Sequence, residues 1–314
     1  MNSKVSIIVP VYKVEKYIGS CAVSLFSQTW NNIEFIFVDN NTPDCSMALV
    51  REVLKSFPSR RDSVVFIHES RQGLGYARYA GIKVATGDYI LHVDSDDWVE
   101  PDFVEALVTK AEEEDADAVY CDFFKEYEGH PEKTRAVGQC ELDEKTGKGA
   151  ITAIHRGRMK AFNCNKLEKR SLYKLDSLVV PIRNMHEDIV YQTQILYGAM
   201  KVVHLARPLY HYRRMRNGAV TAGSKIKARK YSAEGLFHLY SSLPRTGSAL
   251  EYIEHDLLTR AGWYSLCARD FVTLRSNPDA LQYLADMKPK KGQRVSLLCQ
   301  WLLKFSCQAI SSSL

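Results

Sequence analysis

Three acidic residues crowd into four positions of the chain, where Asp94, Asp96 and Asp97 follow an apolar run that ends at Val93. Like charges this close are unfavourable unless a cation or hydrogen-bond donors neutralise them. Carboxylate oxygens are hard ligands that suit Mg²⁺ or Mn²⁺, and an ion held there could bridge to a diphosphate. The alternative is a solvated acidic turn that caps a helix near Pro101, because Asp and Ser favour N-caps. The motif alone leaves both interpretations open.

Two further acids, Glu187 and Asp188, open an amphipathic helical pattern. Transfer of a group to a hydroxyl needs a carboxylate that takes the hydroxyl proton, and this pair could supply it. Acids also gather at helix N-termini for electrostatic reasons alone. Spacing in sequence does not place the pair opposite the first acidic cluster.

Two other polar side chains stand where a nucleotide could bind. Asp39 ends an apolar run and could accept hydrogen bonds from a base or a ribose, although Asp, Asn and Pro are ordinary turn residues. Arg78 lies in the glycine-containing segment 73–81, whose backbone and guanidinium could hold a phosphate. These glycines do not form the dinucleotide-binding fingerprint, and close helix packing explains them equally well.

An aromatic run meets basic residues in segment 208–214. Arg213 could contact a diphosphate or an acceptor, and His211 could assist the metal. A strand with exposed basic ends is the plainer interpretation for His211.

The elements that must position these groups alternate between short apolar runs and helical patterns. Strands are expected at residues 5–9, 33–38, 64–67, 89–93 and 118–123. This alternation predicts the α/β class, with a Rossmann-like, mostly parallel central sheet flanked by helices. Ligands of such sheets bind beyond the carboxyl ends of the strands, where Asp39 and the acids after Val93 stand.

Composition restricts the classes of protein and partner. A chain of 314 residues, 46% hydrophobic and 25% charged, can bury a core and carry a smaller unit. Its eight cysteines form no Cys-x-x-Cys pair, so we expect reduced thiols in the cytoplasm without a disulfide framework or a zinc site. The net charge of +5 favours anionic ligands or anionic lipid and not sequence-specific binding of nucleic acid.

Segment 129–149 is rich in charge and glycine and is expected to be a surface excursion or hinge. The patterns beyond residue 224 are helical, and a basic cluster at 288–294 precedes an apolar stretch at 295–305. That stretch is too short to span a bilayer, which needs about 20 apolar residues. It could lie in the membrane interface on the cytoplasmic face, or pack on the chain's own core or on the second subunit of a homodimer.

The order of the motifs resembles the family-two inverting glycosyltransferases with the GT-A fold, of the bacterial cell-surface polysaccharide type. The resemblance begins with five motifs: residues 5–12, 27–29, 34–39, 77–78 and 94–98. It extends to about residue 216 through residues 165–167, 186–188 and 208–213.

The resemblance implies a donor site in which Pro10, Tyr12 and Asp39 frame the nucleotide base. Arg78 and Arg213 would also belong to the nucleotide-sugar site. It further implies a nucleotide-binding part at 1–125 and an acceptor-binding part at 150–220, within a domain at 1–220 followed by a helical region at 221–314.

The resemblance also implies the chemistry. Asp94 and Asp96 match the Asp-x-Asp motif, in which Asp96 meets Mn²⁺ or Mg²⁺ and Asp94 reaches the ribose or the sugar. Asp188 resembles the general base, with Glu187 as its neighbour and substitute.

The resemblance implies a nucleotide-diphosphate sugar as donor, and in this family the donor is commonly a UDP-sugar. A hexose or an N-acetylhexosamine would be transferred to a hydroxyl of a glycan or lipid-linked glycan. The pathway expected is the synthesis of capsule, O-antigen or lipooligosaccharide.

Two other classes remain as alternatives. A sugar-phosphate nucleotidyltransferase would carry a glycine-rich, lysine-bearing loop after the first strand, which residues 11–14 do not provide. A non-catalytic nucleotide-sugar or glycan-binding module would be favoured by loss of the acids, and all of them are present.

The chain departs from the family pattern at three places. Asn40 and Asn41 stand where Asp-Gly is common, Tyr79 stands where asparagine is usual, and Glu168 replaces an expected aromatic residue. We expect these changes to tune the choice of donor.

Overall fold

The computed structural model describes residues 3–181, 187–214 and 225–242, together with Thr273, Asn277 and Ala280. Contacts divide the chain into two compact units, residues 1–218 and 219–314. The second unit contains α7 (Lys225–Ser242), in which Leu236 and Leu239 are buried. His186, the helical patterns near residue 260 and the segments 288–294 and 295–305 lie outside the described residues.

One half of the sheet in the first unit is parallel. Its strands lie in the order β3 (Val64–His68), β2 (Ile33–Asp39), β1 (Val5–Val11) and β4 (Tyr89–His92). β1, β2 and β4 are mostly apolar and buried because both faces of the sheet are covered, which is why they stand out in the sequence, whereas β3 at the edge of the sheet is only partly buried.

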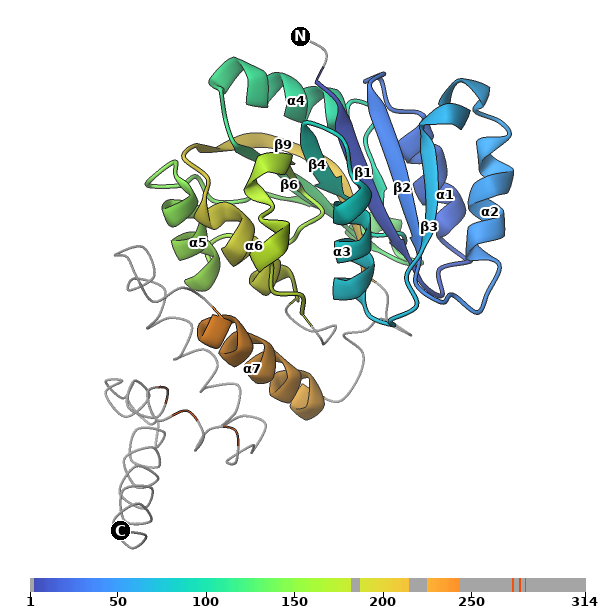
Figure 1. Cartoon of the computed structure of the whole chain (residues 1–314). Helices are drawn as coiled ribbons and strands as arrows, with labels where there is room; N and C mark the ends of the chain where they lie inside the picture. The colour runs from blue at the N-terminus through green and yellow to red at the C-terminus, as the bar shows by residue number, and fades with distance from the viewer. Residues whose placement is uncertain are drawn as a thin grey trace, which may run out of the picture. The chain divides into compact units, whose positions relative to one another are not determined.

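The other half is mixed. The order continues through β8 (Lys166–Lys169), β6 (Ala118–Tyr127), β9 (Val202–Arg214) and β5 (Trp98–Val99), and β7 (Arg135–Val137) pairs with β6. β6 and β9 run parallel, whereas β8 runs antiparallel to both of its neighbours. The α/β class with a central sheet flanked by helices is confirmed (Figure 1).

The helices of the first unit are α1 (Ile18–Phe26), α2 (Ser46–Leu54), α3 (Leu74–Val84), α4 (Phe103–Glu114), α5 (Gly147–His155) and α6 (Glu187–Tyr197). Short 3₁₀ helices span Pro58–Ser63, Pro131–Lys133, Arg170–Leu172 and Leu175–Ser177. Figure 1 shows α3 in front of the parallel strands and α1 behind them.

Alternation along β1 explains these two layers. Ile7 joins the core cluster that contains Leu25 of α1 and Phe103 of α4, whereas Ile8 points to the opposite face. There it meets Gly81 of α3 so closely that a Cβ on Gly81 would overlap the Ile8 side chain. The glycine therefore sets the distance between α3 and the sheet, and α3 carries Arg78 into the site.

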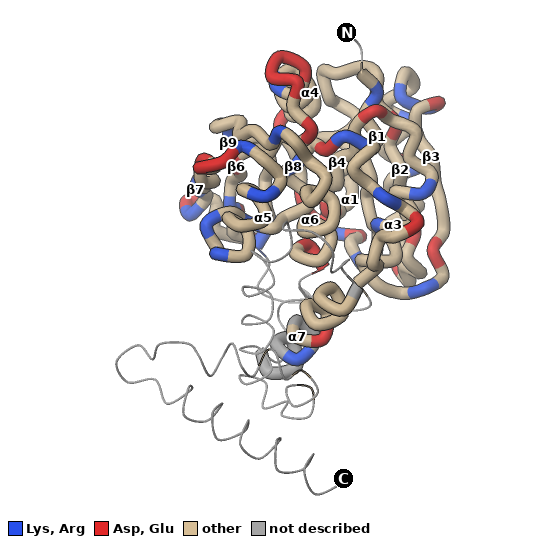
Figure 2. Tube along the Cα trace, turned by 60° about the vertical axis from the view of Figure 1, so that its left-hand side comes forward, with Lys and Arg blue, Asp and Glu red and all other residues tan. Residues whose placement is uncertain are grey.

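Charges of both signs are interspersed over the described surface, with an acidic group at the end of α4 (Figure 2). Within the described ranges no helix is long and apolar enough to cross a membrane.

Candidate active site

A buried arginine joins the two acidic clusters. Arg78 is 1% exposed; its Nη2 donates to Asp94 Oδ1 at 2.7 Å and its Nη1 donates to Asp188 Oδ1 at 3.2 Å. Burial opposes the charge of Arg78, but the negative charges of Asp94 and Asp188 outweigh it and raise the pKa of the guanidinium. The structure thus brings Asp188 and Asp94 together, which spacing in sequence could not predict.

The two acids that open α6 differ in their surroundings. Asp188 accepts hydrogen bonds from Arg78 and from Asn163 Nδ2, the latter at 2.7 Å. Burial raises the pKa of Asp188, and the charge of Arg78 opposes that rise. Burial and the charge of Asp188 raise the pKa of Glu187, which favours the protonated form of Glu187. Asp188 is therefore the better placed of the two to carry a charge.

The turn after β4 is not a solvated acidic turn. Asp97 is 1% exposed and accepts hydrogen bonds from the Tyr210 hydroxyl and from the backbone N–H of Arg213, both at 2.7 Å. Asp102, the residue before α4, makes no side-chain capping hydrogen bond. Asp97 fastens the turn to β9, so the capping alternative does not account for it.

The carboxylates of this turn suit a divalent cation. Burial and the nearby charge of Asp94 raise the pKa of Asp96 to about 6, so a cation would relieve the crowding of negative charge. Among the described residues, oxygens of Asp94 and Asp97 and the sulfur of Cys164 lie within 4.8 Å of one another. Oxygen ligands here match Mn²⁺ or Mg²⁺.

His211, which was expected to assist the metal, lies between two carboxylates. Its Nδ1 lies 2.8 Å from Glu126 Oε1 and its Nε2 lies 2.8 Å from Glu100 Oε1, so carboxylates occupy both ring nitrogens. The ring stacks between Trp98 and Phe124. Binding a metal would require His211 to give up one of these contacts, so in this arrangement it supports the turn.

Arg213 continues the same stack. Its guanidinium lies 4.6 Å from the Trp98 ring centre and 4.8 Å from that of Tyr17, and its Nε donates to the carbonyl oxygen of Asp96 at 2.8 Å. Arg213 therefore lies beside the acidic turn, where its charge could face a diphosphate.

The base-binding residues expected from the sequence lie at the carboxyl ends of β1 and β2. Val11 pairs with Asp39, so Tyr12, which is 39% exposed, follows directly beside it, and Pro10 lies buried within β1. Asp39 Oδ1 accepts the backbone N–H of Thr42, and Asp39 remains partly exposed.

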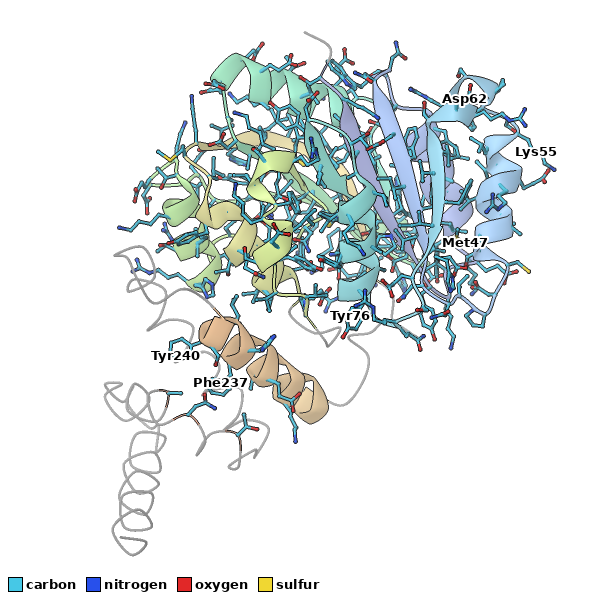
Figure 3. The ribbon with its side chains drawn as sticks, in the orientation of Figure 1. Met47, Lys55, Asp62, Tyr76, Phe237 and Tyr240 are labelled. Atoms are coloured by element: carbon cyan, nitrogen blue, oxygen red, sulfur yellow. The ribbon has the colours of Figure 1, made fainter. Side chains whose placement is uncertain are left out.

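Asn40, next to Asp39, is buried and holds the loop that leads into α3. Its Nδ2 donates to the carbonyl oxygens of Glu69 and Arg71, and its Oδ1 accepts from Gly73. The Arg71 guanidinium lies 4.6 Å from the ring centre of Tyr76, the labelled residue at the start of α3 (Figure 3). Asn40 thus fixes the loop that leads into α3.

Two glycines of segment 73–81, Gly75 and Gly81, serve packing. A Cβ on Gly75 would lie 2.5 Å from the carbonyl oxygen of Pro181, and Gly81 packs on Ile8. The packing alternative is the one that these contacts support.

Sequence reasoning missed four residues of this site: Asn163, Cys164, Gln192 and Tyr210. Their side chains are buried or uncharged and lie in segments that are apolar or that mix apolar and polar residues. No local pattern in the sequence therefore indicates a role for them. Glu168, expected to tune donor choice, is fully buried and accepts hydrogen bonds from Tyr173 and Gln192.

Comparison with protein families matches residues 6–171 to the model described as glycosyl transferase family 2. EpsH of Bacillus subtilis is 35% identical over 67% of this chain and 60% of its own length. Glycosyltransferase GlyA of Streptococcus pneumoniae is 31% identical over 70% of this chain and 32% of its own length. The chain thus spans less than two thirds of these relatives.

Solved structures share the fold. S. aureus TarS 1-349 in complex with UDP-GlcNAc superposes with a TM-score of 0.66 at 19% identity, over 90% of this chain and 80% of that one. The mannosyltransferase PcManGT from Pyrobaculum calidifontis, in complex with GDP-Man and Mn²⁺, gives 0.57 at 16% identity, over 100% of this chain and 86% of that one. The GT-A type of fold predicted from the sequence is confirmed.

Proposed function

The chain belongs to glycosyl transferase family 2, and from that membership we propose that it moves a sugar from a nucleotide-diphosphate sugar to a glycan hydroxyl with inversion. The observation that carries the proposal is the Arg78 bridge, which sets the Asp188 carboxylate beside Asp94. An inverting transfer needs a base near the anomeric carbon and positive charge near the departing diphosphate.

The residues divide the work as follows. Asp188 takes the proton of the acceptor hydroxyl as that oxygen attacks the anomeric carbon. A divalent cation held by Asp96 and Asp94 would supply positive charge beside the leaving diphosphate. Arg213 stands next to the same turn and adds a fixed charge. Arg78 is buried, so it acts by orienting the two carboxylates. Of these, Asp94 would contact the donor.

The donor is proposed to be a UDP-sugar carrying a hexose or an N-acetylhexosamine. The open edge formed by Tyr12 and Asp39 suits a base that stacks and offers hydrogen-bond donors. TarS was crystallised with UDP-GlcNAc, which makes this donor the first to test.

The acceptor is proposed to be a glycan, free or lipid-linked, in cell-surface polysaccharide synthesis. Residues 1–125 would bind the nucleotide and residues 150–220 the acceptor. Residues 221–314 would provide a membrane-interface or dimer contact on the cytoplasmic face.

The test is turnover of a panel of UDP- and GDP-sugars with Mn²⁺, with Mg²⁺ and with chelator, followed by NMR of the anomeric configuration of the product. We expect metal-dependent turnover of one donor, loss in Asp96→Ala, and inversion. Lys55→Ala is the control, because Lys55 lies exposed directly after α2 and away from the site (Figure 3). Binding of a donor with metal but without turnover or hydrolysis would overturn the proposal in favour of a binding module.

A further inference from the structure

A chain of buried hydrogen bonds runs from Glu168 on β8 to Asp188 on α6. Glu168 Oε1 accepts from Gln192 Nε2 at 2.9 Å, and the same nitrogen donates to Asn163 Oδ1 at 2.7 Å. Asn163 Nδ2 then donates to Asp188 Oδ1 at 2.7 Å. The first three residues of this chain are at most 1% exposed, so water does not compete for these bonds.

The order of donors and acceptors along the chain is fixed from its buried end. An amide side chain can be turned to exchange its oxygen and nitrogen, so Asn163 alone could present either atom to Asp188. Glu168 offers Oε1 as an acceptor, which requires the NH₂ group of Gln192 to face it. That NH₂ group also faces Asn163, which directs the Asn163 oxygen to Gln192 and its NH₂ group to Asp188.

The orientation of Gln192 is maintained at a cost. Its Oε1 is buried, and no hydrogen-bond partner for it lies among the described residues. If the Gln192 amide group could adopt either orientation, we would expect its oxygen to be hydrogen-bonded, because a buried oxygen without a partner costs about 1–3 kcal/mol. The two acceptors, Glu168 and Asn163, therefore determine how Gln192 lies.

Asn163 and Arg78 address the same oxygen of Asp188, Oδ1. Two donors on one oxygen fix the plane of the carboxylate, and thereby the direction of Oδ2. We propose that Asn163, oriented through Gln192 by Glu168, is a positioning residue for the Asp188 carboxylate. The inference rests on the proposed role of Asp188 as the base.

The charged groups around Asp188 come from every element packed on it. They are Arg78 on α3, Asp94 after β4, Lys166 on β8 and the neighbouring Glu187. The backbone N–H of Asn163 also favours the charged form of Asp188, and a substitution keeps it. The effect of removing only the Asn163 side chain is therefore a partial one.

The first experiment uses the protein without a donor. Carboxylate ¹³C NMR of the ¹³C-Asp-labelled chain follows the titration of Asp188, which Asp188→Asn identifies by loss of its signal. In Asn163→Ala we expect the pKa of Asp188 to rise by about half to one unit, since a hydrogen bond to its charged form is lost. Asn163→Asp, of the same shape, adds a like charge and should raise it further.

The matched control is Gln28→Ala. Gln28 is also a buried amide, and its side chain contacts the carbonyl oxygens of Ser24 and Glu100 and the backbone N–H of Val104, away from the groups around Asp188. It should lose stability like Asn163→Ala but leave the titration of Asp188 unchanged. An equal shift in both variants would assign Asn163 a merely structural role and overturn the inference.

Kinetics with UDP-GlcNAc, or with the panel donor that is turned over, supply the second readout. We expect kcat of Asn163→Ala to fall about 10- to 100-fold with KM for the donor within about threefold, because positioning acts on the reacting geometry. Gln192→Leu should lower kcat less, and the double variant should be no slower than Asn163→Ala alone, since Gln192 acts through Asn163. If the losses in kcat of the two single variants added up in the double variant, Gln192 would not act through Asn163.

The outcomes separate the two proposals. If Asp188→Asn is inactive while Asn163→Ala keeps the wild-type kcat and titration, the positioning role fails and the proposed function stands. If Asp188→Asn retains full turnover, the base assignment fails, and the positioning role fails with it.

Discussion

Arg78 Nη1 donates to Asp188 Oδ1 at 3.2 Å while its Nη2 holds Asp94, so one buried cation ties the helix α6 to the turn after β4. Neither carboxylate can move far without breaking a contact that water cannot replace, because Arg78 is 1% exposed. The two groups assigned to opposite ends of the reaction, proton removal and diphosphate departure, are thus held in one arrangement.

Replacing Arg78 tests this link. Arg78→Lys keeps the charge but not the planar fork that reaches two carboxylates, so we expect kcat to fall about 10- to 100-fold with a folded protein. Arg78→Met leaves two partly buried acids without their shared cation and should lower the free energy of unfolding by about 1–3 kcal/mol. Steady-state kinetics and urea unfolding measure the two effects, and a fully active Arg78→Lys would contradict the bridging role.

The pH profile should reflect the raised pKa of Asp188. A base acts when deprotonated, so kcat/KM falls as the pH drops through that pKa, which burial places above the usual range of an aspartate. Glu187 is protonated over this range because burial and the charge of Asp188 raise its pKa to about 8, so the neutral variant Glu187→Gln should leave this limb in place while activity persists.

The same variant decides between the two acids of the pair. Abolished activity in Glu187→Gln across the whole pH range would transfer the role of base from Asp188 to Glu187.

Acid stability should depend on Glu34 of β2. Burial disfavours its charge, but hydrogen bonds from Ser6, Thr86 and Lys4 outweigh burial and lower its pKa from 4.5 to about 2. A lowered pKa stabilises the fold above the unfolded-state value, and this contribution disappears as the pH falls from about 4.5 toward 2.

Glu34→Gln removes that contribution. We expect it to cost about 1–3 kcal/mol at pH 7 and to flatten the loss of stability between pH 5 and about 3. Urea unfolding at several pH values checks this, and parallel curves for the two proteins would rule the explanation out.

Two glycines in helices should respond oppositely to alanine. Gly81→Ala pushes a methyl group into Ile8, and overpacking of this kind destabilises by about 1–3 kcal/mol. Gly19 in α1 has no atom within 4 Å of an added Cβ, so Gly19→Ala should be neutral or stabilise by up to about 1 kcal/mol through helix propensity. Thermal unfolding compares them; equal losses would mean that contact with β1 is not the cause.

The sheet was predictable from the sequence where its strands are mostly apolar. β1, β2 and β4 are almost entirely buried, and their short apolar runs predicted their positions. β5 and β7 have two and three residues, too few to show a period, and β8 includes buried Lys166 and Glu168, which no hydropathy pattern would place inside. The type of fold was still predictable, because the order of the sequence motifs does not depend on these short or charged strands.

The site was predictable as a set of acids but not as an arrangement. Asp94 and Asp188 stood out because carboxylates after a strand or at a helix start suggest chemistry. Their meeting through Arg78 depends on how α3 and α6 pack, which is a long-range property. Asp97 belonged to the same motif, yet only its contacts with Tyr210 and Arg213 reveal a structural role.

The most direct test of the account is the rate of sugar transfer by Asp188→Asn with the donor that the wild type uses, at saturating metal. The account predicts that kcat falls at least about 10²-fold while the donor still binds, since general-base catalysis contributes about 10²–10⁴-fold. Transfer at the wild-type rate would contradict the assignment of Asp188 as the base and, with it, the mechanism built on the Arg78 bridge.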